Sequence, residues 1–380
     1  MKTLQMITHN FPEKVNDRKD AGDFISDISE ELTKYFKVNV FCPGKRIEEE
    51  KRGKIKITRF LYPAVEKLGD LKIFNIFDWS NFILFFKNGI QEILIMNKKN
   101  KPDFILAMWA FPAGVFAYLA KRKYKAPYAV WCLGSDINVY ARLPIFRLII
   151  KKILREADFL IADGINLASD VEKLSGKKCF FIPSVSNFPI IEHQKHEGNL
   201  IHLTFLGRVE KIKGPDIFLQ ALSYLETSLK SFRITLIGDG KLMPVLRKMA
   251  KENNLENSIV FMGNMSDKTE ISKIIRQSDW LIIPSRSDSI PLVFSESMKN
   301  GTPVIASDLP DLKYLIHKYK VGYLFQKENA RDLAKVLKNV IIAGRQKEVF
   351  MKNCRKASLD FSLENSGLKV SEYINKLIKN

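Results

Sequence analysis

The chain has 380 residues, which is long for a single hydrophobic core, so we expect two domains. Hydrophobic residues make up 46% and charged residues 27%, which is ordinary for a globular protein and excludes collagen-like, repeat and low-complexity classes. The net charge of +19 favours polyanionic partners, namely nucleic acid, an anionic membrane or phosphorylated ligands, although a basic solvated surface explains it equally well.

The four cysteines stand far apart and form no C-x-x-C pair, which excludes a zinc ribbon and argues against a disulfide framework. The first residues lead into a short strand without the apolar core of a signal peptide, and no run of about 18 apolar residues occurs. We therefore expect a cytoplasmic protein without a membrane span, and peripheral attachment to the inner face of a membrane stays open.

Short apolar strands alternate with amphipathic helical stretches along the first half, which predicts β-α-β units and a parallel sheet. The expected strands are Leu4–Thr8, Val38–Phe41, Lys56–Phe60, Phe104–Ala107, Tyr128–Cys132, Phe159–Ala162 and Phe180–Ile182. The expected helices cover about residues 23–36, 79–97, 112–123, 144–156 and 165–175.

The same alternation restarts in the second half, so the fold class is α/β with two Rossmann-like domains facing a cleft. The expected strands are Leu203–Leu206, Arg233–Ile237, Ile259–Phe261, Leu281–Ile283 and Val304–Ala306. The expected helices cover about residues 215–225, 241–253, 267–277, 291–299, 311–317, 329–343 and 362–378.

The stretch from Pro183 to Gly198 lacks periodicity and is rich in Pro, Ser, Asn, His and Glu, so we interpret it as a linker. The expected domains are residues 1–190 and 191–360, and residues 361–380 form a C-terminal helix that returns to the first domain. Ligands of such sheets bind at the carboxyl ends of strands, near helix N-termini, and the chemistry is expected there.

One candidate anion site follows the first strand of the second half. Gly207 ends that strand, Arg208 and Lys213 follow, and Gly214 then opens a helix. Glycine lets a backbone approach a diphosphate, and the two cations would neutralise its charge. The alternative interpretation is two exposed cations on a loop.

A weaker motif follows the next strand, where the sequence reads Ile237-Gly238-Asp239-Gly240. It does not extend to the G-x-G-x-x-G dinucleotide fingerprint, because Met243 occupies the position of the third glycine. A tight turn from strand to helix explains the motif equally well.

The segment from Pro284 to Glu296 carries the most information. A strand ends at Pro284, a polar loop follows, and Pro291 begins a helix whose free amides at Leu292 and Val293 suit an anion. Glu296 lies one turn into that helix and Asp288 lies eight residues earlier. Carboxylates beside an anion site suit sugar hydroxyls, which donate hydrogen bonds to them; helix capping is the alternative for Asp288.

These motifs, in the order G-R-x-x-x-x-K-G, I-G-D-G, F-x-G and P-S-x-x-D-S-I-P-L-V-x-x-E-x-M-x-x-G-x-P-V-I-A-S, resemble the retaining glycosyltransferases of the GT-B fold, family 4. The resemblance is strong over residues 203–340. It implies that Arg208 and Lys213 bind the donor diphosphate, that Leu292 and Val293 amides hold phosphate, and that Glu296 holds the ribose. It further implies that Gly207 and Gly238 line the nucleotide site and that the backbone near Gly263-Asn264-Met265 frames the base.

Two positions depart from the family pattern. The family usually has Glu, seven residues, Glu, whereas this chain has Asp288 at the first position. Asp is one methylene shorter, and it is expected to bind hydroxyls of the donor sugar and to act in catalysis with Arg208 and Lys213. The second departure is Leu133, which replaces a histidine that contacts the donor sugar in the family.

The first domain resembles the family more weakly and is expected to bind the acceptor. Gly22 matches a glycine loop that the family places against the donor phosphate; an ordinary helix start capped by Asp20 or Asp23 is the alternative. The weaker candidates for contacts to the acceptor or the sugar are Trp109, His9 at the end of the first strand, and Asp136 in Leu133-Gly134-Ser135-Asp136. A helix N-cap is the alternative role of Asp136.

Two segments suggest contact with a membrane surface. Phe74 to Met96 is crowded with aromatic residues, and Arg142 to Arg155 interleaves cations with aliphatic residues. A basic amphipathic helix can lie on anionic lipid, but helices packed on the sheet with cations outward explain both segments as well.

The resemblance implies transfer of a sugar from a nucleoside diphosphate sugar to an acceptor hydroxyl with retention, in glycan, polysaccharide or glycolipid synthesis. No D-x-D pair is placed for a metal, so no metal or further cofactor is expected. The acceptor is a glycan, a lipid-linked saccharide or a small molecule. Three alternatives remain: a sugar-nucleotide epimerase of the same fold, a catalytically silent family member, and a nucleic-acid-binding protein, which no recognised motif supports.

Overall fold

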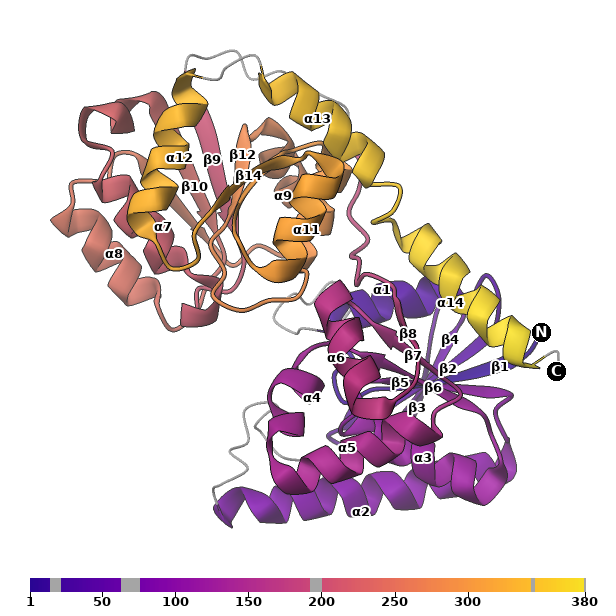
Figure 1. The fold of residues 1–380 in the computed structure, drawn as a ribbon. Coiled ribbons are helices and arrows are strands. Elements are labelled where there is room, and N and C mark those ends of the chain that lie inside the picture. Colours follow the sequence, from indigo (N-terminus) through magenta and orange to yellow (C-terminus); the bar gives the residue numbers. More distant parts are fainter. Residues whose placement is uncertain (14–21, 63–75, 192–199, 343–345, 379–380) are drawn as a thin grey trace. The chain divides into compact units, whose positions relative to one another are not determined.

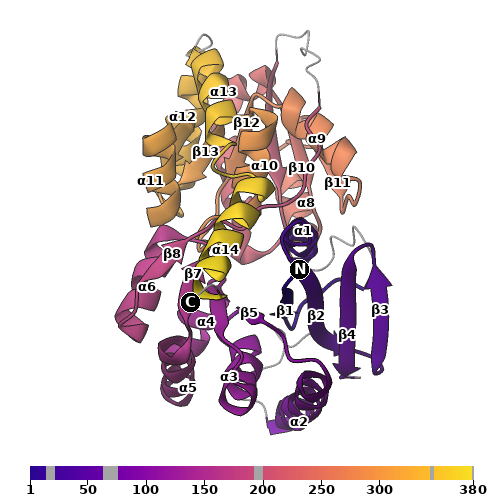
Figure 2. The ribbon, with the colours of Figure 1, turned by 90° about the vertical axis from the view of Figure 1, so that its right-hand side faces the viewer.

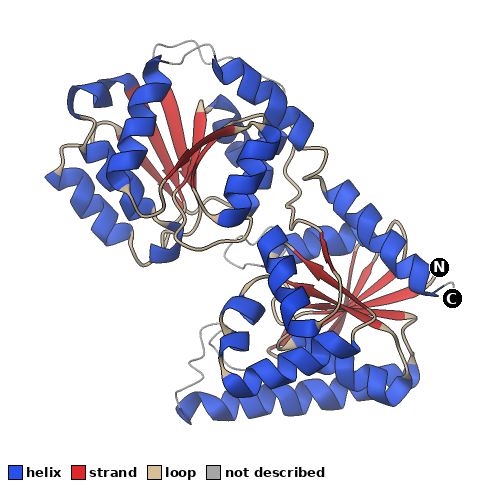
Figure 3. Ribbon diagram, viewed as in Figure 1, coloured by secondary structure: helices blue, strands red, loops and turns tan. Residues whose placement is uncertain are grey.

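The computed structural model describes residues 1–13, 22–62, 76–191, 200–342 and 346–378. The chain divides into two compact units: unit 1 consists of Met1–Ser184 and Ser366–Asn380, and unit 2 consists of Val185–Asn365. Each unit has a largely parallel sheet with helices on both faces (Figures 1 and 3). Residues 192–198 of the expected linker lie outside the described residues.

The sheet of unit 1 has the strand order β3-β4-β2-β1-β5-β6-β7-β8, and every neighbouring pair is parallel except β3 and β4. Figure 2 shows β4 and β3 at one edge of this sheet. From β1 the chain adds strands first on one side of the sheet and then, from β5 onward, on the other side. The topological switch point of unit 1 therefore lies between β1 and β5. The strands are β1 (Thr3–Ile7), β2 (Lys37–Gly44), β3 (Glu48–Arg52), β4 (Ile55–Leu61), β5 (Phe104–Met108), β6 (Tyr128–Cys132), β7 (Phe159–Ala162) and β8 (Cys179–Phe181).

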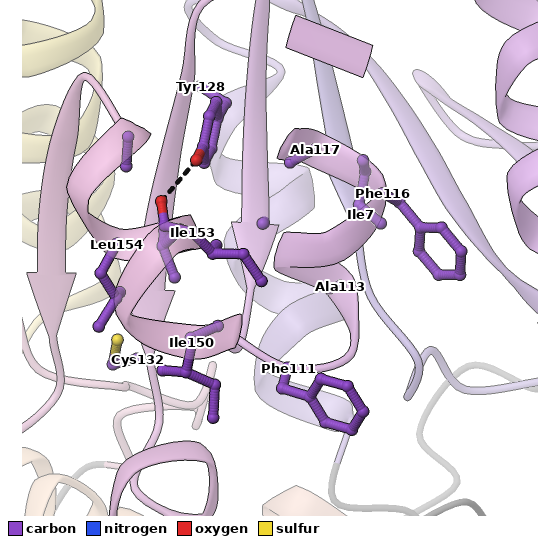
Figure 4. Close-up of a cluster of buried hydrophobic side chains, with 14 of the residues drawn as sticks. Ile7, Phe111, Ala113, Phe116, Ala117, Tyr128, Cys132, Ile150, Ile153 and Leu154 are labelled. Carbon is purple, nitrogen blue, oxygen red and sulfur yellow. Dashed lines mark hydrogen bonds between the residues drawn. The ribbon is translucent and has the colours of Figure 1, made fainter. Parts of the chain in front are cut away.

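The helices of unit 1 pack apolar side chains on the sheet and on each other. Figure 4 shows this packing around Phe116, Ile150 and Ile153, where the Tyr128 hydroxyl donates to the Ile153 carbonyl. The helices are α1 (Asp23–Leu32), α2 (Ile76–Lys99), α3 (Ala113–Tyr124), α4 (Ser135–Asn138), η1 (Tyr140–Arg142), α5 (Pro144–Glu156) and α6 (Ile165–Ser175).

The edge strand β3 is a difference from the sequence analysis, which expected no strand there. Its five residues, Glu-Glu-Glu-Lys-Arg, are all charged, so they show no apolar pattern. The strand forms because Gly53, with φ at +57°, turns the chain back and lets Glu48–Arg52 pair antiparallel with β4. Charged side chains suit an exposed edge, since they discourage pairing with another chain.

The sheet of unit 2 is entirely parallel, with the order β11-β10-β9-β12-β13-β14. Numbered along the chain this is 3-2-1-4-5-6, the doubly wound order, and its switch point lies between β9 and β12. The sequence analysis missed the short edge strand β14. The strands are β9 (Ile201–Leu206), β10 (Phe232–Ile237), β11 (Ile259–Gly263), β12 (Trp280–Ile283), β13 (Val304–Ser307) and β14 (Gly322–Phe325).

The helices of unit 2 follow the expected ranges except for α13 and the short 3-10 helices η2 and η3, which the sequence analysis did not predict. They are η2 (Lys211–Lys213), α7 (Pro215–Ser223), η3 (Glu226–Ser231), α8 (Met243–Glu252), α9 (Lys268–Gln277), α10 (Leu292–Asn300), α11 (Pro310–Tyr319), α12 (Ala330–Ile342) and α13 (Gln346–Ala357).

The last helix, α14 (Leu363–Ile378), has most of its residues in unit 1. The ring of Tyr373 lies 4.2 Å from that of Phe180 and 5.8 Å from that of Phe159, and the Lys2 ammonium donates to the Ile378 carbonyl. Within the described residues, no helix is both long enough and apolar enough to cross a bilayer.

Candidate functional site

The predicted motifs of unit 2 gather at its switch point. Gly207 directly follows β9 and Pro284 directly follows β12, and these two strands are neighbours in the sheet. The loops after them therefore leave the same edge of the sheet side by side and turn away in opposite directions. This arrangement opens a ligand site at the carboxyl ends of parallel strands.

The glycines at this edge allow two loops to touch through their backbones. A Cβ on Gly238 would stand 1.9 Å from the Gly207 carbonyl oxygen, and one on Gly240 would stand 2.6 Å from that of Val209. The loops are joined by hydrogen bonds from the Gly207 amide to Ile237 and from the Val209 amide to Asp239. Gly207 and Gly238 thus lie together, and both leave the strand ends free of side chains.

Lys213 and Asp288 meet across the switch point. The Lys213 ammonium donates to both carboxylate oxygens of Asp288, at 2.8 and 3.0 Å, and both side chains are largely buried. The two residues come from the loops that follow β9 and β12 respectively. An ammonium has three N–H donors, so this pair leaves one donor of Lys213 and several acceptor positions of Asp288 for a ligand.

Arg286, which the sequence analysis did not identify, connects the loop after β12 to the loop after β9. Its guanidinium forms a bidentate pair with Asp216 in the first turn of α7, at 2.8 and 2.7 Å, and also donates to the Lys211 carbonyl and to Glu328. Its amide donates to the Ile212 carbonyl. The signal in the sequence was an arginine inside the polar loop between Pro284 and Asp288, but its carboxylate partner lies 70 residues away.

The first turn of α10 is open, as the anion-site prediction requires. Pro291 is its N-cap residue and makes no side-chain cap. The capping interpretation of Asp288 is therefore wrong, because Asp288 pairs with Lys213 and the helix starts four residues later, at Leu292. Leu292 and Val293 are half-buried in the first turn. Glu296, one turn further along α10, is buried, with 4% of its surface exposed.

Arg208 and Met265 lie on the two loops that flank this arrangement. Arg208 is exposed and pairs with Glu210 at 3.0 Å, so its guanidinium can reorient toward a ligand at little cost. Met265 is half-buried in the loop after β11, whose Gly263 carbonyl accepts a hydrogen bond from the Gly238 amide. The structure thus connects the end of β11, just before the Met265 loop, to the glycine loops.

A second site candidate lies at the switch point of unit 1, where His9 follows β1 and Trp109 follows β5. The two rings lie 4.4 Å apart between centroids at 57°. Trp109 has φ at +74°, a left-handed conformation that is costly for a bulky residue and that clusters at functional sites. Burial lowers the pKa of His9 to about 4, which keeps the imidazole neutral at pH 7.

Asp136 has a role that differs from both expectations. Its carboxylate is fully buried and accepts hydrogen bonds from the amides of Ala110, Gly134 and Ile137, at 2.7, 3.1 and 3.1 Å. Burial raises its pKa to about 6, although these amide bonds oppose the shift. Asp136 lies inside α4, whose N-cap residue is Gly134. Its carboxylate is used to position the loop after Trp109, and a contact with sugar hydroxyls is not assigned to it.

Gly22 is the N-cap residue of α1, and the chain needs a glycine there. A Cβ at this position would stand 2.3 Å from the Asn10 carbonyl oxygen. Two residues after Asn10, the Pro12 carbonyl accepts hydrogen bonds from both Arg52 and Arg59. The expected cap Asp20 lies outside the described residues, and Asp23 stands in the first turn of the helix.

No group of three or more His, Cys, Asp or Glu side chains within the described ranges is arranged to hold a metal ion. The candidate site residues of unit 2 lie at strand ends and at the starts of the helices that follow. They offer cationic side chains, carboxylates and free backbone amides.

Comparison with known families assigns both halves of the chain. Residues 187–357 match the family described as glycosyl transferases group 1. Residues 19–164 match the family described as glycosyl transferase 4-like. The two matches do not overlap, and together they cover most of the chain.

Relatives and solved structures agree with these matches. An uncharacterized glycosyltransferase of Methanocaldococcus jannaschii is 26% identical over 275 residues, 72% of this chain and 76% of the relative. Sucrose-phosphate synthase from Thermosynechococcus elongatus has the same fold with a TM-score of 0.79 at 16% identity, covering 100% of both chains. The Anabaena protein HepE in complex with UDP-glucose matches with a TM-score of 0.72 at 15% identity, covering 99% of this chain and 100% of that one.

Proposed function

Because this chain belongs to the group 1 glycosyltransferases and has the GT-B fold, we propose that it moves a sugar from a nucleoside diphosphate sugar to an acceptor hydroxyl, with retention at the anomeric carbon. The observation that carries the proposal is the switch point of unit 2. There Lys213 and Asp288 meet on the loops that follow the neighbouring strands β9 and β12. The open first turn of α10 follows the Asp288 loop. The UDP-glucose bound by the structural neighbour supports a nucleotide sugar as donor.

The donor's nucleotide part would bind along α10 and the glycine loops. The amides of Leu292 and Val293 would donate to phosphate oxygens, since the first amides of a helix have no intrahelical partner. The bare backbone at Gly207 and Gly238 would let the diphosphate approach the strand ends. Glu296 would accept hydrogen bonds from ribose hydroxyls, and the loop that carries Met265 would frame the base.

Lys213, Arg208 and Asp288 would act on the reacting bond. As the bond from the anomeric carbon to the diphosphate breaks, negative charge grows on the departing oxygen, and the two cations would neutralise it. Lys213 can do so through its third N–H without leaving Asp288. The acceptor oxygen would bond to the anomeric carbon as the bond to the diphosphate breaks, and its hydroxyl proton would pass to the departing diphosphate oxygen. Asp288 would hold hydroxyls of the sugar.

Unit 1 would bind the acceptor. Trp109 and the neutral His9 form a ring pair at the switch point, and Asp136 holds the backbone that follows Trp109. Aromatic faces and neutral imidazoles suit contact with sugar rings and hydroxyls. We propose a glycan, a lipid-linked saccharide or a small molecule as the acceptor.

A thermal-shift panel with UDP-, GDP-, ADP- and dTDP-sugars tests the donor assignment, followed by product analysis with and without candidate acceptors. We expect one nucleotide class to raise the melting temperature and its sugar to appear on an acceptor. Release of an altered nucleotide sugar from donor alone would replace the transferase with an epimerase. Binding without any product would identify a catalytically silent member, a result compatible with the loss of histidine at Leu133.

A further inference from the structure

Helix α5 presents an apolar stripe to solvent. Ile145 is 73% exposed, Leu148 is 70% exposed, and Ile149 is also exposed. Residues three and four apart share one side of a helix, so these three side chains form a continuous surface, which we call the α5 apolar face. Large aliphatic side chains gathered on a surface mark an interaction site, whereas single ones do not.

The core packing of α5 does not use this face. Its opposite side carries Ile150, Ile153 and Leu154, which are buried in unit 1 (Figure 4). The ring of Phe146 anchors the first turn inward, with its centroid 5.0 Å from that of Phe111. The helix is therefore folded and fixed by one side, and the α5 apolar face is left for another surface.

The charges around the α5 apolar face are mostly positive, and the exception is the exposed Glu156 that ends the helix. The segment from Val139 to Arg155 contains five Lys or Arg residues and no Asp or Glu. Arg142 and Arg147 are exposed beside the apolar stripe. Further along the same side of the helix, Lys152 is exposed as well. A rim of cations around an aliphatic patch is complementary to anionic headgroups above acyl chains.

We propose that α5 binds the surface of a bilayer that contains anionic phospholipid. Ile145, Leu148 and Ile149 enter the region between headgroups and acyl chains, and the cations contact lipid phosphates while their aliphatic stems stay in the interface. Of the two segments singled out in the sequence, only the one around α5 carries this inference. A second copy of this chain would meet the same cations and repel them, which favours lipid as the occupant.

Sedimentation of the full chain with vesicles tests this proposal. The vesicles are phosphatidylcholine alone or a mixture with phosphatidylglycerol, at low and high salt. We expect binding to the mixed vesicles that weakens with salt, and weak binding to phosphatidylcholine. The variant Ile145→Ser/Leu148→Ser should bind at least tenfold more weakly, and Arg142→Gln/Arg147→Gln should lose the preference for anionic vesicles.

A matched control is Ile190→Ser/Leu359→Ser, because these two side chains, 73% and 72% exposed, lie elsewhere on the chain. This control should bind vesicles like the parent, and melting temperatures should agree among all variants. Equal sedimentation of Ile145→Ser/Leu148→Ser and the parent would overturn the proposal. So would light scattering that shows a dimer in the parent and a monomer in that variant. The assay measures lipid binding alone, so its outcome is independent of the sugar-transfer proposal.

Discussion

Lys213 and Asp288 form a bidentate ion pair at 2.8 and 3.0 Å although 75 residues separate them in the chain. Their loops leave neighbouring strands, β9 and β12, at the switch point of unit 2. The pair fixes the ammonium and leaves one N–H of Lys213 and acceptor positions of Asp288 available to a ligand.

The first prediction concerns Asp288. Asp288→Asn should lower the turnover number for sugar transfer by about 10- to 100-fold, because it removes a charged hydrogen-bond acceptor for the sugar. Affinity for the free nucleoside diphosphate should change by less than about threefold, since that ligand lacks the sugar. Steady-state kinetics and calorimetry measure the two effects. Asp267→Asn, at the cap of α9, is the control and should leave transfer unchanged; full transfer by Asp288→Asn would remove Asp288 from the site.

The second prediction concerns Arg208. Its side chain is exposed and its ion pair with Glu210 lies at the surface, so Arg208→Ala should barely change the stability of the fold. Single-turnover sugar transfer should nevertheless slow markedly, because the guanidinium would neutralise charge that appears only as the diphosphate departs. Glu210→Gln removes the partner and keeps the arginine, and it should transfer sugar at the parent rate. Rapid-quench measurements that give the same rate for Arg208→Ala and the parent would contradict the diphosphate role.

The third prediction concerns Glu296. Glu296→Gln should weaken binding of the nucleoside diphosphate by about 1.5–3 kcal/mol, the range for a lost hydrogen bond to a charged group. Gln is preferred to Ala here because the side chain is buried and Gln keeps its shape. Calorimetry with the diphosphate found in the thermal-shift panel measures the loss. Glu270→Gln on the exposed side of α9 should bind as the parent does, and equal affinity for Glu296→Gln would refute the ribose assignment.

The fourth prediction concerns Arg286. Arg286→Ala should destabilise the protein by about 1–3 kcal/mol, because it breaks a bidentate pair with Asp216 and leaves that carboxylate partly buried. Transfer should fall as well, because the Asp288 loop loses its attachment to the start of α7. Urea unfolding with Asp216→Asn and the double variant gives the coupling energy of the pair. Additive effects of the two substitutions on the free energy of unfolding would show that the pair contributes no coupling energy. Lys248→Ala, which breaks the exposed pair of Lys248 with Glu252, serves as the control.

The fifth prediction uses the pKa of His9, which burial lowers from 6.5 to about 4. Between pH 6.5 and 4 the unfolded chain binds a proton at this residue that the folded chain refuses, so the stability of the fold decreases as the pH falls through this range. The loss reaches at most about 3 kcal/mol near pH 4. Asp136, with its pKa raised to about 6, contributes with the opposite sign over the same range.

Comparison of the parent with His9→Gln isolates the histidine, because Asp136 contributes equally to both. The parent should lose more stability than His9→Gln between pH 7 and 4.5, measured as the urea midpoint of unfolding. His317→Gln, at an exposed position, should follow the parent. Parallel curves for the parent and His9→Gln would mean that the imidazole is protonated freely in the folded protein.

The sequence alone determined most regular elements and the positions of the site motifs. Strand Tyr128–Cys132 and helix 165–175 were predicted with the observed bounds, because a short apolar run and an apolar periodicity are local properties. The motifs around Gly207 and Asp288 were recognisable for the same reason: glycine, proline and charged residues at strand ends are read along the chain.

Tertiary structure alone decided which of these residues meet. Strand β3 exists only because Glu48–Arg52 pairs with β4, and its own residues carry no strand pattern. The pairs Lys213–Asp288, Arg286–Asp216 and His9–Trp109 depend on strand order, since only neighbouring strands bring their loops together. The observed role of Asp136 differs from the predicted one because backbone amides from two loops surround its carboxylate. Burial among these amides is a property of the packed chain that no local pattern encodes.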